Sequence, residues 1–467
     1  MKKVLRSCLL GIPLIIAVAG FMLAGEVFGD AVFYGLCMYG MEYQDPTPNL
    51  LTEIARWIAP LATLSGMLML FSAVRYRIRA FVRYLRQQSV AVYGPERKEV
   101  LAQLGAKGID GREDFSFVRA QSYILMGSEE ENFLFYQKNR AALAGAAVYF
   151  QCRSLPAQSV ADAKLRLFCP EETAARLFWK QRELYRDSAA CGHQMKVVFI
   201  GCGILGEQLL TYALQNNIFD PNQHIEYHIF GDGRHFLGVH PELSAISDPV
   251  IFHGEPWYGQ IPLLEEAKAV IVLAQKGQMG TVQDLLAATL CQKIDVFTAN
   301  EMPKLLESQG RLRIFDWKGE AQKLPYILSD TLFERAKRIN LRYAVLYGGA
   351  ADTEADKEEQ WAKLDGFTRY SNISAADYHE VRLKMLAAVG EDPEHLGADC
   401  LEALSELEHI RWCRYHQLNN WRCGQPGDGR HKDAARRIHT DLVPYEALSD
   451  GEKEKDRENI RILLSVE

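Results

Sequence analysis

A glycine-rich turn in the middle of the chain has the spacing of a phosphate-binding loop. The apolar run 197–200 leads into Gly201, Gly203 and Gly206, and a helical apolar pattern follows. In a G-x-G-x-x-G turn, the first glycine permits the tight bend and the second lets a pyrophosphate approach the backbone. The third lets the helix lie close to the strand. This order of elements predicts a dinucleotide-type fold, although such glycines also occur as packing residues in folds that bind nothing.

The residues after the glycine turn complete the predicted site. Residues 225–230 have the pattern of the next strand, and Asp232 follows it, where a carboxylate can accept the hydroxyls of an adenosine ribose. We expect NAD or a related adenine nucleotide there, while Arg234 and His235 leave a phosphorylated or unusual nucleotide open. The predicted cofactor-binding residues are Gly201, Gly203, Ile204, Leu205, Gly206, Asp232 and Ala274.

A second group of chemistry-bearing side chains lies near the C-terminus. A helical run there places tryptophan, histidine and charged residues on adjoining turns. Tryptophan can stack a base, arginine can pair with phosphate, and histidine or tyrosine can hydrogen-bond a sugar or a base edge. The alternative is that these side chains form the small core of a helical module. The possible second ligand site comprises Glu408, Arg411, Trp412, Trp421, His439 and Tyr445.

The elements that must position these residues follow an α/β pattern. Strand and helix patterns alternate after Gln88, which predicts mostly parallel sheets with ligands bound at the carboxyl ends of the strands. We expect tandem Rossmann-like, doubly wound domains at residues 89–190 and 191–323, the first degenerate because it lacks a glycine loop. An all-α domain is expected at residues 324–467. No set of residues in the crevice specifies a catalytic acid or nucleophile, so no catalytic residue is predicted.

Two uncharged runs near the N-terminus, residues 7–25 and 57–74, are long enough to span a bilayer. Lysine and arginine precede the first run and an arginine-rich stretch follows the second, and positive charge stays inside. The pattern predicts a two-span hairpin over residues 1–88 in the inner membrane, with both termini and the main domains cytoplasmic. A cleaved signal peptide is the alternative for the first run. Because one hairpin cannot enclose a pore, we also expect a homo-oligomer.

Charge and cysteine spacing exclude other classes of protein. The 467-residue chain has a net charge of -7, which argues against a nucleic-acid binder. None of the ten cysteines has zinc-binding spacing, so no metal site is predicted.

The C-terminal segment EHIRWCRYHQLNNW, followed by HTDLVPYEALSDGEKEKDREN, resembles the ryanodine-receptor-type (RyR) repeat domain. The central units resemble the nucleotide-binding (TrkA-N) domains of Trk-type potassium uptake regulators and of channels with a regulator-of-conductance module. The whole layout is similar to bacterial membrane proteins that join a two-helix hairpin, such domains and a RyR-type domain. The residues that carry the RyR resemblance are Glu408, His409, Arg411, Trp412, Trp421, His439, Leu442, Val443, Pro444, Tyr445, Leu448, Lys453, Lys455, Asp456 and Arg457.

These resemblances imply a nucleotide-sensing regulatory protein anchored in the lipid bilayer, acting as a ligand-gated ion channel or as a regulator or effector of the potassium-transport type. Two departures weaken the channel interpretation, because the first nucleotide unit lacks its glycine loop and no T-V-G-Y-G filter is present. The alternatives are a membrane-anchored NAD-dependent oxidoreductase and a non-catalytic scaffold.

Overall fold

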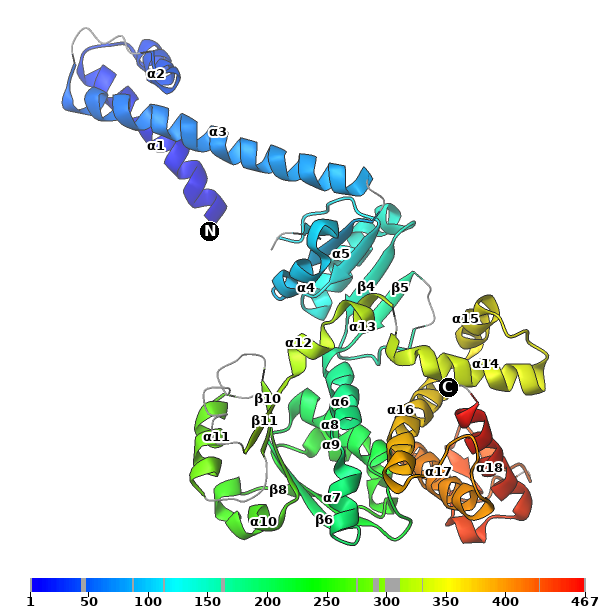
Figure 1. The fold of residues 1–467 in the computed structure, drawn as a ribbon. Coiled ribbons are helices and arrows are strands. Elements are labelled where there is room, and N and C mark those ends of the chain that lie inside the picture. The colour runs from blue at the N-terminus through cyan, green and yellow to red at the C-terminus, as the bar shows by residue number, and fades with distance from the viewer. Residues whose placement is uncertain are drawn as a thin grey trace. The chain divides into compact units, whose positions relative to one another are not determined.

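The computed structural model describes residues 2–42, 48–85, 88–111, 114–160, 164–273, 276–288, 294–298, 311–329, 331–427 and 429–465 (Figure 1). The chain forms two compact units. The first comprises residues 1–89 with 118–120, and the second comprises residues 90–117 with 121–467. The first unit is built from helices, and the second holds two parallel sheets followed by a group of helices.

Small side chains bring the N-terminal helices together. Ala17 and Phe21 pack against Ala31 and Ala55 in a core shared by all three helices. The helices are α1 (Lys2–Leu23), α2 (Phe28–Cys37) and α3 (Leu50–Leu85).

No helix in the described part of the chain is long and apolar enough to cross a membrane. The first two turns of α3 carry the charged residues Glu53 and Arg56. This finding overturns the predicted two-span hairpin and the two-pass inner-membrane location.

The same helices leave large apolar side chains exposed. Ile15, Leu23 and Trp57 are 69%, 78% and 71% exposed. Side chains of this kind are available for contact with another molecule. The homo-oligomer expected from the sequence stays a prediction.

The first sheet has five parallel strands in the order β2-β1-β3-β4-β5. This order is the flavodoxin-like variant of the doubly wound fold. A Cβ on Gly94, which follows β1 with φ of +114°, would lie 2.3 Å from the backbone of Met126, so only glycine fits there. The elements are β1 (Val90–Tyr93), α4 (Arg97–Leu104), β2 (Gly108–Asp110), β3 (Ser122–Leu125), α5 (Glu129–Leu143), β4 (Ala147–Gln151) and β5 (Leu165–Phe168).

The second sheet has six parallel strands in the order β11-β10-β9-β6-β7-β8. Counted along the chain, this is the order 3-2-1-4-5-6 of dinucleotide-binding sheets. The mixed α/β class with parallel sheets is therefore confirmed. The elements are β6 (Gln194–Ile200), α8 (Gly203–Asn216), β7 (His224–Phe230), α9 (Arg234–Val239), β8 (Val250–His253), α10 (Ile261–Glu266), β9 (Ala269–Val272), α11 (Gln278–Ala287), β10 (Ile294–Thr298) and β11 (Leu312–Asp316).

A pair of helices between the two sheets belongs to the core of the second sheet. These are α6 (Pro170–Gln181) and α7 (Leu184–Ala190). Trp179 is buried and its indole N–H donates to Leu209 O on α8 at 2.8 Å. Phe178 contacts Phe297 of β10 with ring centroids 4.6 Å apart. Since α6 directly follows β5, it joins the two sheets covalently.

Helices dominate the rest of the chain, but the predicted all-α C-terminal domain is wrong in one detail. A small three-stranded sheet in the order β12-β14-β13 follows α17. Its strands are only two residues long and mostly polar, which leaves no period-two pattern to find in the sequence. The elements are α12 (Trp317–Ala321), α13 (Leu324–Leu328), α14 (Glu334–Gly348), α15 (Glu354–Lys363), α16 (Gly366–Val389), α17 (Ala398–Leu418), β12 (Arg422–Cys423), β13 (Lys432–Asp433), β14 (Ile438–His439) and α18 (Asp450–Leu464).

Buried ion pairs attach these helices to the second sheet. Arg176 on α6 donates to Asp377 on α16 at 2.6 and 3.0 Å, and the two side chains are 0% and 1% exposed. Lys180 lies 3.0 Å from the same carboxylate. Arg414 on α17 pairs with the buried Asp248 at 2.8 Å. Each pair joins residues more than 150 positions apart in the chain.

Removing one member of the buried pair should strongly destabilise the protein. Arg176→Met leaves the Asp377 carboxylate buried with Lys180 alone, and we expect a loss of about 3 to 5 kcal/mol in unfolding free energy. Adding Asp377→Leu to this variant should recover part of the loss. Urea denaturation followed by tryptophan fluorescence measures it.

The control is Arg186→Met on the adjacent α7, because Arg186 and Glu183 form an exposed pair at 2.6 Å. This variant should leave the unfolding midpoint unchanged. Equal midpoints for the two single variants would contradict the role given to the buried pair.

Candidate functional site

A cavity of about 960 Å³ lies where the second sheet's helix α8 faces the C-terminal helices. We call it the α8–α17 cavity. Its walls come from α6, α8, the start of α16, the end of α17 and the small sheet. This volume suits a ligand of nucleotide size.

One wall is aromatic. Trp412 and His416 lie one turn apart on α17, with ring centroids 4.0 Å apart. His439 of β14 meets the Trp412 ring edge to face at 4.9 Å. Trp421 packs on Phe367, at the start of α16, at 5.5 Å. The structure thus brings together three residues of the predicted second ligand site, Trp412, Trp421 and His439, on one side of the cavity.

Another part of the cavity wall holds a buried carboxyl group. Glu172 of α6 is 4% exposed, and burial raises its pKa. The hydroxyl of Tyr212 on α8 donates to Glu172 at 3.2 Å, and that of Tyr370 on α16 donates at 3.0 and 3.1 Å. Three separate elements therefore meet at one polar contact in the cavity wall.

The rim carries positive charge. Arg153, Lys432 and Arg437 are exposed and line the cavity. Arg153 pairs with Glu171 at 2.8 Å, and Arg437 donates to the carbonyl of Asn419 at 2.8 Å. Aromatic rings inside and cations at the edge are the two features that bind a base and a phosphate.

Two other predicted ligand residues lie behind the aromatic wall. Glu408 accepts from Arg382 at 2.6 Å and from Arg411 at 2.8 and 3.0 Å. Burial alone would raise the pKa of Glu408, but the two guanidinium groups hold it below its usual value. Arg411 also donates to Ser374 at 3.0 Å. These side chains form a buried ionic cluster, and neither Glu408 nor Arg411 lines the cavity.

The sixth predicted residue, Tyr445, is also outside the cavity wall. Its hydroxyl donates to Glu402 at 3.0 Å, and its ring lies 5.9 Å from His409. His409 stacks beside Trp412 at 5.8 Å. Its two ring nitrogens face Asp456 at 3.2 Å and the carbonyl of Val443 at 2.8 Å. Burial opposes the imidazolium charge, but Asp456, the Cys413 sulfur at 3.4 Å and the Val443 carbonyl together raise the pKa of His409 to about 10.

The glycine turn has the geometry expected from its spacing. Gly201 and Gly203 have φ of +100° and +67°, in the left-handed region that favours glycine. A Cβ on Gly206 would lie 2.9 Å from Leu273, so the third glycine lets α8 approach the sheet. Of the other predicted residues, Ile204 is exposed and Leu205 is buried. Ala274 lies outside the described residues.

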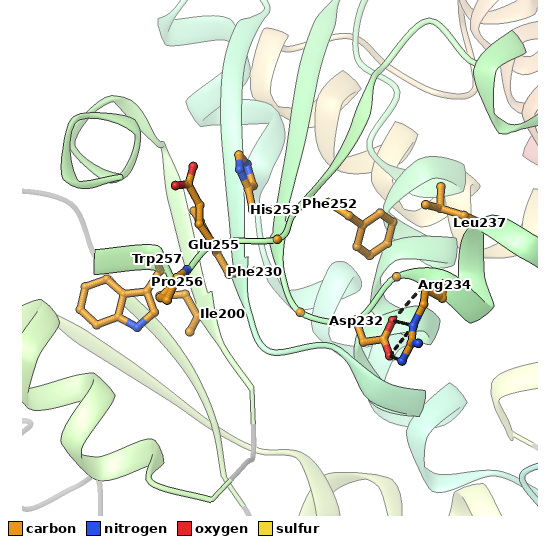
Figure 2. A pocket seen from close by; sticks show the side chains of 13 residues that line it. Ile200, Phe230, Asp232, Arg234, Leu237, Phe252, His253, Glu255, Pro256 and Trp257 are labelled. Atoms are coloured by element: carbon orange, nitrogen blue, oxygen red, sulfur yellow. Dashed lines mark hydrogen bonds and ion pairs between the residues drawn. The ribbon is translucent and has the colours of Figure 1, made fainter. Parts of the chain in front are cut away.

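The carboxylate of Asp232 forms an ion pair within the protein. Arg234 donates to both carboxylate oxygens, at 2.6 to 3.1 Å, and lowers the pKa of Asp232 to about 2 (Figure 2). The pair borders a hollow of about 600 Å³ at the carboxyl ends of β6, β7 and β8. His253 and Trp257 lie on the side of this hollow away from the ion pair (Figure 2). A ribose hydroxyl would have to share the carboxylate with Arg234.

Sequence reasoning missed most of the cavity's polar and supporting residues. Glu172, Tyr212, Phe367 and Tyr370 come from three helices and have no shared motif. His416 was detectable, because its spacing from Trp412 places both on one helical stripe.

A possible metal-ligand group lies near the small sheet. His431, Asp441 and Glu452 place one ligand atom each within 4.8 Å of one another. Lys455 donates to both carboxylate oxygens of Glu452 at 2.7 Å. Because this ion pair already neutralises one of the carboxylates, we assign no ion to the group.

Comparison with known proteins identifies one part of the chain. Residues 394–466 match the family model described as the RyR domain. The match spans α17, the small sheet and α18, and so includes Trp412, Trp421 and His439. The C-terminal RyR domain expected from the sequence is therefore confirmed. Neither the curated proteins nor the solved structures contain a match to the chain.

The raised pKa of His409 predicts a pH dependence of stability. The folded value of about 10 lies above the unfolded value near 6.5. Protonation therefore favours the folded state. This contribution is fully present below about pH 6.5 and is lost as pH rises toward 10. Urea denaturation at several pH values should show a steeper fall in stability for the natural protein than for His409→Gln.

The control is His235→Gln, since His235 is exposed and lies outside the RyR domain. Its stability profile should keep the slope of the natural protein. Parallel profiles for the natural protein and His409→Gln would contradict a charged His409.

Proposed function

We propose that this protein is a nucleotide-sensing regulatory protein and that its ligand binds in the α8–α17 cavity. One observation carries the proposal. The aromatic residues of the RyR domain face α8, the helix that begins at the glycine turn, across a space of nucleotide size. A ligand held there touches both the RyR domain and the second parallel sheet.

The two walls suit the parts of a nucleotide. A base can stack on Trp412 or Trp421, and such contacts contribute about 1 to 3 kcal/mol per base. Phosphates can reach the exposed cations Lys432 and Arg437 at the rim. Sensing follows if the ligand binds one arrangement of these walls more tightly than another, because only that difference shifts the population.

The glycine turn supports a second nucleotide site. Its φ angles, the close approach of Gly206 and the 3-2-1-4-5-6 strand order agree with the resemblance to TrkA-N domains and with NAD or a related adenine nucleotide as ligand. The Asp232–Arg234 pair makes it the weaker candidate for the principal sensor.

Calorimetry on the full chain tests the proposal with ATP, ADP-ribose, NAD and cyclic AMP as probes. A ligand present at one hundred times its Kd should add about 2.7 kcal/mol of stability. Trp412→Ala should weaken binding at least tenfold, since the stacking contact is lost. Trp412 is half-buried, so the variant should keep its fold.

Two control variants separate the sites. Trp257→Ala removes an indole from the hollow beside Asp232, and Gly203→Ala strains the glycine turn. Trp257→Ala should bind the probe as the natural protein does, and Gly203→Ala, whose strain lies at the start of α8, should bind it more tightly than Trp412→Ala does. Loss of binding in these two variants, with Trp412→Ala unaffected, would place the ligand in the glycine crevice. If none of the probes binds the folded chain, nucleotide sensing is contradicted.

A further inference from the structure

We propose that the α8–α17 cavity reads the edge of a neutral nucleobase with two histidines fixed in opposite tautomers, His416 as acceptor and His439 as donor. The inference rests on the proposed function, because it names what the ligand must present to the aromatic wall. The ligand class is a planar heterocycle with a hydrogen-bond donor next to an acceptor, such as the amino group and N1 or N7 of adenine.

The tautomer of His416 follows from its own helix. Its Nδ1 lies 2.8 Å from the carbonyl oxygen of Trp412, one turn earlier on α17. A carbonyl oxygen can only accept, so Nδ1 carries the hydrogen. In the neutral ring, Nε2 then has the lone pair. Among the described residues no partner takes up this nitrogen, and His416 lines the cavity.

The tautomer of His439 is the opposite one. The backbone N–H of Asp441 donates to His439 Nδ1 at 3.2 Å. Nδ1 must therefore hold a lone pair, and in the neutral ring Nε2 carries the hydrogen. Asp441 lies two residues after His439, the last residue of β14, so the local chain path fixes the ring. His439 also lines the cavity.

Both rings are neutral near pH 7. Burial lowers the pKa of His416 to about 3; the hydrogen bond to the Trp412 carbonyl opposes this shift, whereas His439, Arg411 and Lys432 act in the same direction as burial. Burial also lowers the pKa of His439, with Lys432 and His431 acting in the same direction and Asp441 and Glu452 opposing. At neutral and higher pH both rings therefore keep their hydrogen-bonding roles.

The two rings are placed to act on one ligand edge. Their centroids lie 6.1 Å apart, and the planes cross at 73°. Trp412 contacts both, at 4.0 and 4.9 Å, and Trp421 contacts both, at 5.4 and 6.3 Å. An aromatic wall alone would also suit a cationic ligand. A neutral acceptor beside a neutral donor instead favours an uncharged base. The base donates to His416 and accepts from His439.

The tautomers can be measured without any ligand. Long-range ¹H–¹⁵N spectra of the full chain labelled at histidine should show His416 protonated at Nδ1 and His439 at Nε2. The pattern should hold from about pH 7 to 8. His416→Gln and His439→Gln assign the signals by their disappearance. Inverted tautomers, or titration of either ring within this interval, would overturn the inference.

Binding tests the role of the acceptor. Purine riboside triphosphate lacks the amino group of ATP, so it leaves His416 Nε2 without its donor. We expect it to bind about tenfold more weakly than ATP to the natural protein. His416→Phe, which has no acceptor, should bind the two equally. Equal binding of the two by the natural protein would overturn base reading by His416.

A matched pair of variants tests the donor. His439→Gln keeps an N–H group at a similar reach and should bind ATP nearly as the natural protein does. His439→Phe should lose about tenfold. Equal loss in both would overturn a donor role for His439. Failure of ATP and the other probes to bind at all overturns the proposed function, whereas ATP binding with inverted tautomers overturns only this inference.

Discussion

The arrangement of the second compact unit depends on charges that are buried and must be paired. The Arg176–Asp377 pair joins α6 to α16 with both side chains excluded from solvent, and Arg414 with Asp248 does the same for α17. A buried charge without its partner costs several kcal/mol, so these helices have one favoured position on the sheet. Apolar contacts alone would tolerate a slide of one helix along another. The ion pairs do not tolerate such a slide, so they keep the cavity walls in register.

A second layer of buried charge supports the aromatic wall itself. Glu408 is held between Arg382 and Arg411, and the charged His409 lies behind Trp412. In the sequence Glu408 and Arg411 looked like ligand contacts, because charged residues near tryptophans suit a nucleotide. The structure gives these two residues another physical role, since Glu408 accepts from Arg382 and Arg411, and Arg411 also donates to Ser374. These buried charges hold the face of α17 that carries Trp412 and His416. The two rings are then the groups on this face that a ligand can contact.

Sequence reasoning succeeded where one local stretch holds the whole signal. The turn from β6 to α8 could be predicted because glycine conformations depend on neighbouring residues, and the RyR residues follow one another along α17 and β14. The cavity could not be predicted, since Glu172, Tyr212 and Tyr370 meet only after two parallel sheets and a helical layer have assembled. The sequence also did not reveal the partner of Arg234. This arginine was expected to favour a phosphorylated nucleotide, but in the structure it binds Asp232.

Helix α8 is the element through which the two candidate sites can influence each other. Its first residue belongs to the glycine turn, while Gln208, Tyr212 and Gln215 on later turns face the α8–α17 cavity. Leu209 and Leu210, between these two ends, are packed in the core of the second sheet. A ligand that shifts the start of α8 therefore also shifts the cavity wall. By thermodynamic linkage, the effect of one site on the affinity of the other must be equal in both directions.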